Sequence, residues 1–508
     1  MALALPPIFF VPAIIPGVVA LFWLLETTSS LKRAFGYGWA LGFGYFVAGL
    51  YWLGHAIAVD LATFWWAMPF ALFGLQSGLA IFFGLVSLVA VWVRRQFGVG
   101  SWGLVFLLVF NWLISDLLRS SILTGFPWNL LGTSLTLHPV FSQLASVGGV
   151  HLLTALVVTW AVSPALVVSG SGSGSGSGLG RRAAIASFIV LPILVGGFGL
   201  ARINSLGAEA DKSVAGVHLR LVQANIAQTL KWDPALSRAN LQKHVDLSNE
   251  PLADNQPVPN LIIWPETAVP FALNRSVEAQ QNLAAAVLGR APDGVLITGA
   301  NKVVGEQKTL EVWNHLYVLD ALGNQVAGYD KHHLVPFGEY MPYRSILNFA
   351  KLTEGTVDFS AGPGPQTVRV PTIPPFSPII CYEGIFSGNV VDKTDGDAKW
   401  LLSVTNDGWF GLSSGPHQHL AATVLRSVEE GLPLVRASNS GVSVVADSLG
   451  RLRSKLGLGK VGVVDAALPT ALENPPLYAR YGLKTVMVLL ISLLFGVVMS
   501  MRNKRKFN

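Results

Sequence analysis

Cysteine is almost missing from this chain, which has one, Cys381, in 508 residues. A single cysteine excludes an intramolecular disulfide, so the cysteine count says nothing about an oxidising compartment. Charged residues are also scarce, at 13% of the sequence, while apolar residues make up 51%. With a mean hydropathy of +0.50, the chain is too apolar for a soluble protein, and the composition predicts membrane spans.

The chain also lacks the large basic excess that is typical of nucleic-acid-binding proteins. Its net charge is +6. Much of that charge lies in short basic pairs beside apolar runs and in the tail from Arg502 to Lys506. Membrane topology explains such a distribution better than a nucleic-acid partner does. We therefore expect no nucleic-acid partner.

Long apolar runs fill residues 1–202, and each is long enough to cross about 30 Å of hydrocarbon. We predict six spans here and a seventh at about 485–501; the six lie at about 5–25, 35–58, 62–93, 101–118, 144–168 and 183–201. The predicted domains are thus a transmembrane bundle (1–202), a globular domain (203–482), and a final span with a basic tail (483–508). No charged region precedes the first apolar run, so we expect no cleavable signal peptide.

Basic pairs set the orientation of these spans. Lys32-Arg33, Arg94-Arg95 and Arg181-Arg182 follow the first, third and fifth spans, so all three pairs fall on one side. The positive-inside rule makes that side the cytoplasm. Residues 203–482 and Met1 are then predicted outside. A Ser-Gly repeat, 169–178, is predicted to be a flexible cytoplasmic linker.

Residues 203–482 alternate between apolar strands and helical stretches, which predicts an α/β or α+β domain with a sheet core. The predicted strands are 218–223, 261–264, 295–298, 313–319, 379–380, 401–405 and 434–446, and the predicted helices are 234–249, 277–288 and 417–430.

Cys381 follows a short predicted strand, Ser377 to Ile380, and precedes Gly384. A thiol at such a strand end can reach a cleft from a rigid base, and a thiolate is a strong nucleophile. The more common role for a lone cysteine beside two isoleucines is a small core residue. Other polar residues in the domain favour the first interpretation.

Two further strand ends carry reactive groups. Glu266 follows the apolar strand that begins at Leu261, and a third predicted turn places Lys331 and Glu339 on either side of an apolar stretch. Acyl transfer through a thioester needs such a set: a carboxylate as general base, a cation beside the thiolate and the oxyanion, and a thiol nucleophile. Taken alone, Glu266, Lys331 and Glu339 could each be an ordinary solvated charge at the surface.

Glu266, Lys331 and Cys381, in this order and each after a strand, resemble the triad of the nitrilase (carbon–nitrogen hydrolase) superfamily over about residues 217–450. With the membrane spans, the chain resembles the apolipoprotein N-acyltransferase family. Local stretches that share this resemblance are Thr124–Trp128, Gln228–Pro234, Asn406–Gly411 and Pro416–His419. The resemblance implies an α-helical membrane bundle plus a nitrilase-like αββα sandwich.

The resemblance also implies a reaction. A fatty acyl chain passes from a phospholipid to a cysteine thioester and then, in a ping-pong scheme, to the N-terminal amine of the diacylglyceryl-cysteine of apolipoproteins. Glu266 would be the base, Lys331 the oxyanion partner and Cys381 the nucleophile. Residues implied as supporting or substrate-binding are Trp232, Glu339, Tyr382 and Glu383.

The family also implies a bacterial inner (cytoplasmic) membrane protein whose catalytic domain faces the periplasm. We expect no cofactor and a monomer. Paired histidines at 332–333 and near 417–419 lack a standard set of further ligands, so we predict no metal. Family members begin with one more span, so this chain departs from the pattern at its N-terminus.

Two other functions stay open at this point. A membrane-tethered amidase or nitrilase-type hydrolase would use the same Glu-Lys-Cys triad with water as acceptor. The other open function is that of a transporter or receptor whose outer domain only binds. The predicted spans hold few ionisable residues at mid-span, where a transport path would need them.

Overall fold

The computed structural model describes residues 1–168, 178–253, 256–306, 309–343 and 357–501. The chain divides into two compact units. The first consists of Met1–Gly54, Phe64–Ser205 and Pro475–Asn508, and the second of His55–Thr63 and Leu206–Asn474. The Ser-Gly repeat up to residue 177 and the basic tail from residue 502 lie outside the described residues.

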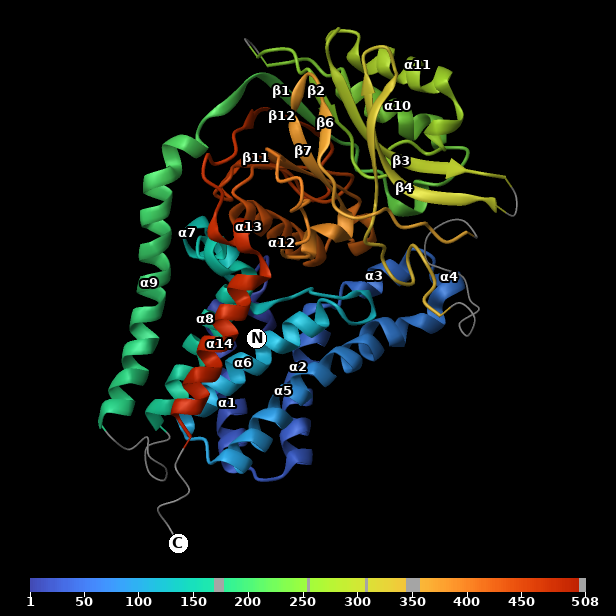
Figure 1. Cartoon of the computed structure of the whole chain (residues 1–508). Coiled ribbons are helices and arrows are strands. Elements are labelled where there is room, and N and C mark those ends of the chain that lie inside the picture. The colour runs from blue at the N-terminus through green and yellow to red at the C-terminus, as the bar shows by residue number, and fades with distance from the viewer. Residues whose placement is uncertain (169–177, 254–255, 307–308, 344–356, 502–508) are drawn as a thin grey trace. The chain divides into compact units, whose positions relative to one another are not determined.

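Helices make up the first unit (Figure 1). The longer ones are α1 (Ile14–Thr27), α2 (Leu31–Gly49), α5 (Leu75–Phe97), α6 (Ser101–Arg119), α8 (Ala145–Val168), α9 (Gly178–Ala210) and α14 (Leu483–Met499). The short ones are α3 (Leu53–Ala58), α4 (Leu61–Phe64), α7 (Pro139–Ser142) and α13 (Leu477–Tyr481), of which α3 and α4 lie mostly in the second unit. Near the C-terminus of the chain, α14 returns to pack on α6 and α8.

Four helices in the described part of the chain are long and apolar enough to cross a membrane. They are Phe70–Phe97, Ser101–Arg119, Ala145–Val167 and Gly180–Ala210, and they correspond to the third to sixth predicted spans. The first and seventh predicted spans form shorter apolar helices, Val11–Thr27 and Leu483–Met499. The second predicted span holds α2, which ends at Gly49, and a separate short helix, α3.

The second unit is built on two six-stranded sheets. The first has the order β12-β1-β2-β3-β4-β5, and the second β11-β10-β9-β8-β7-β6. The strands of the first sheet are β1 (Ser213–Gln223), β2 (Leu261–Ile263), β3 (Val295–Val304), β4 (Glu311–Asp320), β5 (Gln325–Asp330) and β12 (Gly462–Pro469). Those of the second are β6 (Val368–Val370), β7 (Ile373–Ile380), β8 (Trp400–Thr405), β9 (Leu434–Ser438), β10 (Ser443–Ala446) and β11 (Leu452–Leu456).

The number of strands differs from the sequence prediction in two ways. The single strand expected at 434–446 is two antiparallel strands, β9 and β10, because the segment from Asn439 to Val442 turns between them. Among the strands of the described residues, four were not predicted: β5, β6, β11 and β12. The first three contain exposed or partly buried residues at most positions or are very short, so their apolar signal is weak.

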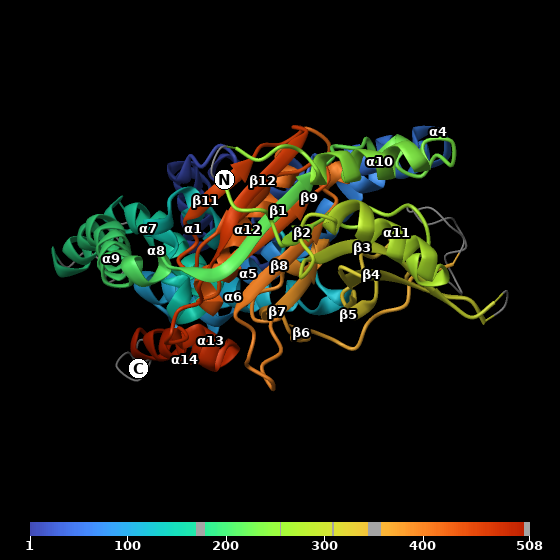
Figure 2. The same cartoon turned by 90° about the horizontal axis from the view of Figure 1, so that it is seen from above.

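Alternation of side chains along the strands builds the layers. Residues on one face of both sheets, such as Leu221, Ile263 and Val404, form one shared core between the sheets. Figure 2 shows strands of the first sheet, such as β1 and β12, beside strands of the second, such as β9 and β11. The opposite face of the first sheet, including Ile262, packs with α10 (Ser237–Ser248) and α11 (Val277–Leu288). The outer face of the second sheet packs with α12 (Gly415–Glu430). Because side chains alternate with period 2, each strand serves two layers, and the order is helix, sheet, sheet, helix.

Strand direction decides where the loops meet. β1, β2 and β3 are parallel, as are β7, β8 and β9. β4 is antiparallel to both β3 and β5, so β5 runs in the same direction as β2. The residues that follow β2 and β5 therefore emerge at the same edge of the first sheet.

Candidate active site

Cys381 follows β7 and begins a short 3-10 helix, η10 (Cys381–Ile385). Its side chain is only 8% exposed, and its backbone has φ +52°. That left-handed conformation is costly for a residue with a Cβ, so the surrounding structure must hold it. A sharp turn between a strand and a helix presents the side chain away from both elements, as in the nucleophile elbow of hydrolases.

Glu266 lies in the turn after β2 and is 7% exposed. One carboxylate oxygen, Oε1, accepts a hydrogen bond from Asn314 Nδ2 at 2.7 Å. The other, Oε2, accepts from the backbone N–H of Asn406 at 2.9 Å. These two donors hold the carboxylate in one orientation inside the protein.

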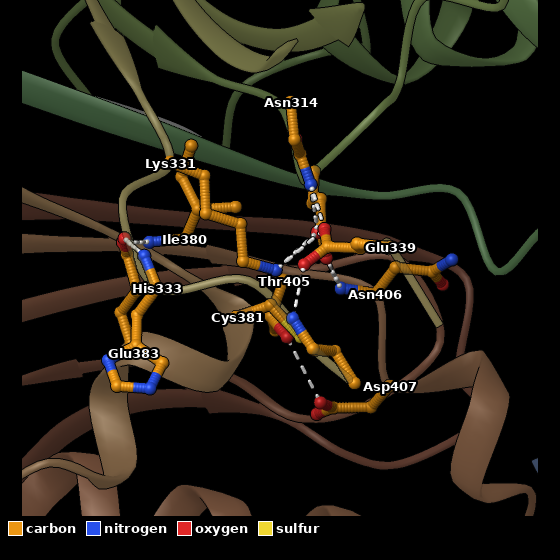
Figure 3. A network of polar contacts seen from close by, with 12 residues as sticks. Asn314, Lys331, His333, Glu339, Ile380, Cys381, Glu383, Thr405, Asn406 and Asp407 are labelled. Carbon is orange, nitrogen blue, oxygen red and sulfur yellow. Dashed lines mark hydrogen bonds and ion pairs between the residues drawn. The ribbon is translucent and has the colours of Figure 1, made fainter. Parts of the chain in front are cut away.

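Lys331 follows β5 and is 1% exposed. Its Nζ donates to Glu339 Oε1 at 2.9 Å and lies 3.7 Å from Glu266 Oε1. Burial alone would lower the pKa of Lys331, but the carboxylates of Glu339 and Glu266 raise it above its ordinary value. The amine is therefore a fixed cation. Figure 3 shows how Lys331, Glu339 and Asn314 converge above Cys381.

Glu339 and Asn314 complete this polar group. Glu339 Oε2 accepts from the backbone N–H of Val335 at 2.8 Å, which fixes the turn that carries Glu339. Asn314, on β4, donates from one nitrogen to both carboxylates, at 2.7 Å to Glu266 and 3.0 Å to Glu339. A neutral amide thus bridges two acidic groups. Sequence reasoning missed Asn314 because it lies inside a strand, without a motif.

Burial raises the pKa of the Cys381 thiol, and the negative charge of Glu266 raises it further, while Lys331 acts in the opposite direction. The resting thiol is therefore protonated at neutral pH. A thiol in this state needs a base beside it when it attacks, and Glu266 is the acidic group that most affects its pKa.

Glu383 has a different environment from the triad. Its Oε1 accepts from the backbone N–H groups of His332 (2.8 Å) and His333 (3.1 Å) and from the hydroxyl of Tyr329 (2.9 Å). Its Oε2 accepts from the backbone N–H of Ile380 at 2.7 Å. Both oxygens are thus occupied, and Glu383 ties the segment after Lys331 to the end of β7.

Tyr382 follows Cys381, and its ring packs against other aromatic rings. The ring meets those of His333 and Phe386 edge to face, with centroids 5.7 Å and 5.2 Å away. The side chain is 6% exposed. Such packing holds the turn after Cys381 in place.

Trp232 lies, half-buried, in the turn that follows a 3-10 helix, η7 (Gln228–Leu230). Its neighbour Lys231 was not singled out in the sequence, yet it is 5% exposed and its Nζ donates to the backbone oxygen of Glu266 at 3.0 Å. Burial lowers the pKa of Lys231 to about 8, against the opposing influence of Glu266 and Cys381. A second lysine therefore borders the triad.

Hydrogen bonds within the protein account for two of the four histidines that raised the question of a metal, His332 and His419. His332 Nδ1 lies 2.7 Å from Glu383 Oε1, and His419 contacts Asp407 and the backbone oxygen of Cys381. Within the described ranges no group of three His, Cys, Asp or Glu side chains has the geometry of a metal site.

Two sheets of this topology, with Glu266, Lys331 and Cys381 at their strand ends, define a carbon–nitrogen hydrolase domain. A family model of that name, carbon–nitrogen hydrolase, matches residues 218–473. A second model, the apolipoprotein N-acyltransferase N-terminal domain, matches residues 1–163.

The relatives are similar over nearly the whole chain. The apolipoprotein N-acyltransferase of Rhodopseudomonas palustris is 36% identical over 99% of this chain and 93% of its own length. That of Rickettsia prowazekii is 33% identical over 98% and 96%. Among solved structures, an amidase of the nitrilase superfamily from Nesterenkonia AN1 is 19% identical, with a TM-score of 0.36, over 51% of this chain and 93% of that chain.

The chain belongs to the apolipoprotein N-acyltransferase family. The sequence resemblance is therefore confirmed, as is the fold class of a helical membrane part plus a nitrilase-like α/β domain. It is a membrane protein and an acyltransferase. The roles of individual residues and the predicted domain boundaries remain proposals.

Proposed function

We propose that this protein transfers a fatty acyl chain from a membrane phospholipid, through a thioester on Cys381, to the N-terminal amine of the diacylglyceryl-cysteine of apolipoproteins. The observation that carries the proposal is the buried group of Glu266, Lys331 and Cys381 in a chain with apolar helices. The family to which the chain belongs supports the same reaction.

In the first half-reaction, Glu266 takes the proton of Cys381 as the sulfur attacks the ester carbonyl of the phospholipid. Negative charge develops on the carbonyl oxygen. Lys331, which Glu339 holds at 2.9 Å, stabilises that oxyanion together with the backbone N–H of Tyr382, the residue after the nucleophile. The carbon–oxygen ester bond then breaks, and the lysophospholipid leaves with the proton from Glu266.

In the second half-reaction, the acceptor amine attacks the thioester carbonyl. Glu266 takes a proton from the attacking nitrogen, and the same donors stabilise the second oxyanion. The carbon–sulfur bond breaks, an amide forms, and the thiol of Cys381 recovers its proton. Trp232, in the turn beside Lys231, is proposed to line the path of a substrate.

The basic pairs support an orientation in a bacterial inner membrane. By the positive-inside rule, we propose that Lys32-Arg33 and Arg94-Arg95 lie in the cytoplasm and the α/β unit in the periplasm. Both lipid substrates are available there, and a protein that acts on them benefits from spans of its own.

The test is the intact mass of the purified protein after incubation with phospholipid whose acyl chain is isotopically labelled. We expect a mass increase of one acyl group on Cys381 without acceptor, and its loss to peptide when a diacylglyceryl-cysteine peptide is added. Cys381→Ala should show neither change. Release of the labelled chain into water, with none on the peptide amine, would instead establish a membrane-tethered amidase-type hydrolase.

A further inference from the structure

A group of buried polar side chains, His419, Asp407 and Arg436, lies next to Cys381, and the proposed mechanism does not use it. His419, in the first turns of α12, is fully buried. Its Nε2 lies 2.9 Å from the backbone oxygen of Cys381, and its Nδ1 lies 2.8 Å from Asp407 Oδ1. Because a carbonyl oxygen can only accept, Nε2 must carry a hydrogen and donate it to Cys381.

Asp407 and Arg436 fix the other side of this imidazole. Arg436 Nη2 donates to Asp407 Oδ2 at 2.9 Å and lies 3.1 Å from His419 Nδ1. Arg436 Nη1 also donates to the hydroxyls of Ser403 and Thr423. None of these three charged or titratable side chains is more than 1% exposed. Burying such a group is costly, and a role in specifying one local geometry would account for keeping it.

The contact with Cys381 acts on one peptide unit. The carbonyl of Cys381 and the N–H of Tyr382 belong to the same planar trans peptide and point in opposite directions. A donor that holds the carbonyl therefore sets the direction of the N–H. Cys381 has φ +52°, so this peptide follows a strained residue whose conformation the surroundings must maintain.

We infer that His419 is a positioning residue, which holds the Cys381 carbonyl so that the Tyr382 N–H points at the oxyanion during acyl transfer. Asp407 and Arg436 keep the imidazole in the orientation that this requires. The inference rests on the proposed use of a Cys381 thioester, and it extends the site from the triad to a second set of buried residues.

Two substitutions separate the two sides of the ring. His419→Gln places an amide N–H near the position of Nε2 and can still donate to the Cys381 carbonyl. His419→Asn places its amide near Nδ1, where it can meet Asp407 and Arg436 but cannot reach Cys381. His417→Asn, on the same helix and partly exposed, is the matched control for the substitution itself.

Two rates on the full-length protein in detergent provide the readout. The first is the rate at which a p-nitrophenyl ester acylates Cys381, a reaction that passes through an oxyanion. It is monitored by the release of nitrophenolate. The second is alkylation of Cys381 by iodoacetamide, which forms no oxyanion. We expect His419→Asn to slow acylation by about 10²-fold or more while alkylation stays within about threefold, because only the oxyanion donor is misdirected. His419→Gln should recover most of the acylation rate, and His417→Asn should change neither rate.

Equal loss of acylation and alkylation in His419→Asn would overturn the inference, since the thiol itself would then be affected. So would a wild-type acylation rate in that variant, or a failure of His419→Gln to recover more than His419→Asn. The ester tests the geometry even if phospholipid is not the donor. If wild type reacts with the ester but gains no acyl group from phospholipid, the proposed function fails while the role of His419 is still decided by the variants.

Discussion

Lys231 carries a prediction about pH. Its pKa is lowered by burial to about 8 in the folded protein, from 10.5. Below pH 8 both the folded and unfolded chains hold the proton. There the buried charge lowers the free energy of unfolding by its full contribution, roughly 3 kcal/mol. Between pH 8 and 10.5 the folded chain releases the proton first, so the free energy of unfolding rises.

Lys231→Met removes this dependence. We expect the melting temperature of the variant, relative to wild type, to be highest at pH 7 and to decline steadily as the pH approaches 10. The substitution also leaves the backbone oxygen of Glu266 without its donor, but that cost does not change with pH. A difference that stays constant from pH 7 to pH 10 would contradict the prediction.

Asn314 is predicted to matter because it separates two carboxylates. Asn314→Asp replaces the donor shared by Glu266 and Glu339 with a third acidic group. Like charges at this distance oppose one another, so we expect thioester formation to slow by about 10²-fold or more. Asn324→Asp is the matched control, since Asn324 also donates to a carboxylate, that of Asp320, but is exposed in a turn. The acylation rates and melting temperatures of the two variants are compared with those of wild type. The prediction requires slow acylation in Asn314→Asp and an unchanged rate in Asn324→Asp.

At this scale the sequence could identify residues whose position after a strand is visible in the chain. Glu266, Lys331 and Cys381 belong to that class, and so does Glu339 through its turn. Asn314 and Lys231 reach the site only through pairing of distant segments, which no local pattern records. His419 lay in a stretch that matched the family, but nothing in that stretch shows that it contacts Cys381.

At the scale of elements, Glu383 holds together two loops whose relative position the proposed mechanism requires. It accepts from the backbone N–H of Ile380 at the end of β7 and from those of His332 and His333 after β5. Glu383→Gln leaves one acceptor oxygen for these donors, so we expect a loss of stability of about 1–3 kcal/mol for each buried donor left without an acceptor. Melting temperature and acylation should fall together.

Glu266→Gln provides the contrast. It should abolish acylation, because its role is in proton transfer. The melting temperature should fall less than in Glu383→Gln, because Glu266 accepts from two donors and Glu383 from four. If Glu383→Gln keeps its melting temperature and loses only acylation, Glu383 must be assigned to the reaction instead of to the junction of the two loops.

Elements with strong apolar patterns were predictable from sequence, and those with weak patterns were not. The helix expected at 277–288 has those bounds, and β2 and β8 were expected within a residue of their observed ends. β11 has exposed or partly buried residues throughout, so only its pairing with β10 makes it a strand. The order of strands in each sheet also depends on long-range pairing, and local sequence does not encode it.

For the whole molecule, the basic pairs predict on which side of the membrane the loops of the helical unit and the α/β unit lie. In a Cys381→Ser background, Ser29→Cys lies in the exposed turn between α1 and α2, next to Lys32-Arg33, and Leu322→Cys lies at a strongly exposed turn of the α/β unit. An impermeant thiol reagent should label Leu322→Cys from outside spheroplasts, and Ser29→Cys only after permeabilisation. The reverse pattern of labelling would invert the proposed orientation.

The left-handed backbone at Cys381 has a consequence for how this sequence can diverge. Alanine and serine are strained at φ +52°, whereas glycine adopts such a conformation without strain and asparagine tolerates it well. As long as the thiol is needed, selection holds an unfavourable residue type in place. In a descendant that lost the chemistry but kept the fold, this constraint would be gone. We expect position 381 of such a descendant to become glycine or asparagine, while the left-handed backbone conformation is kept.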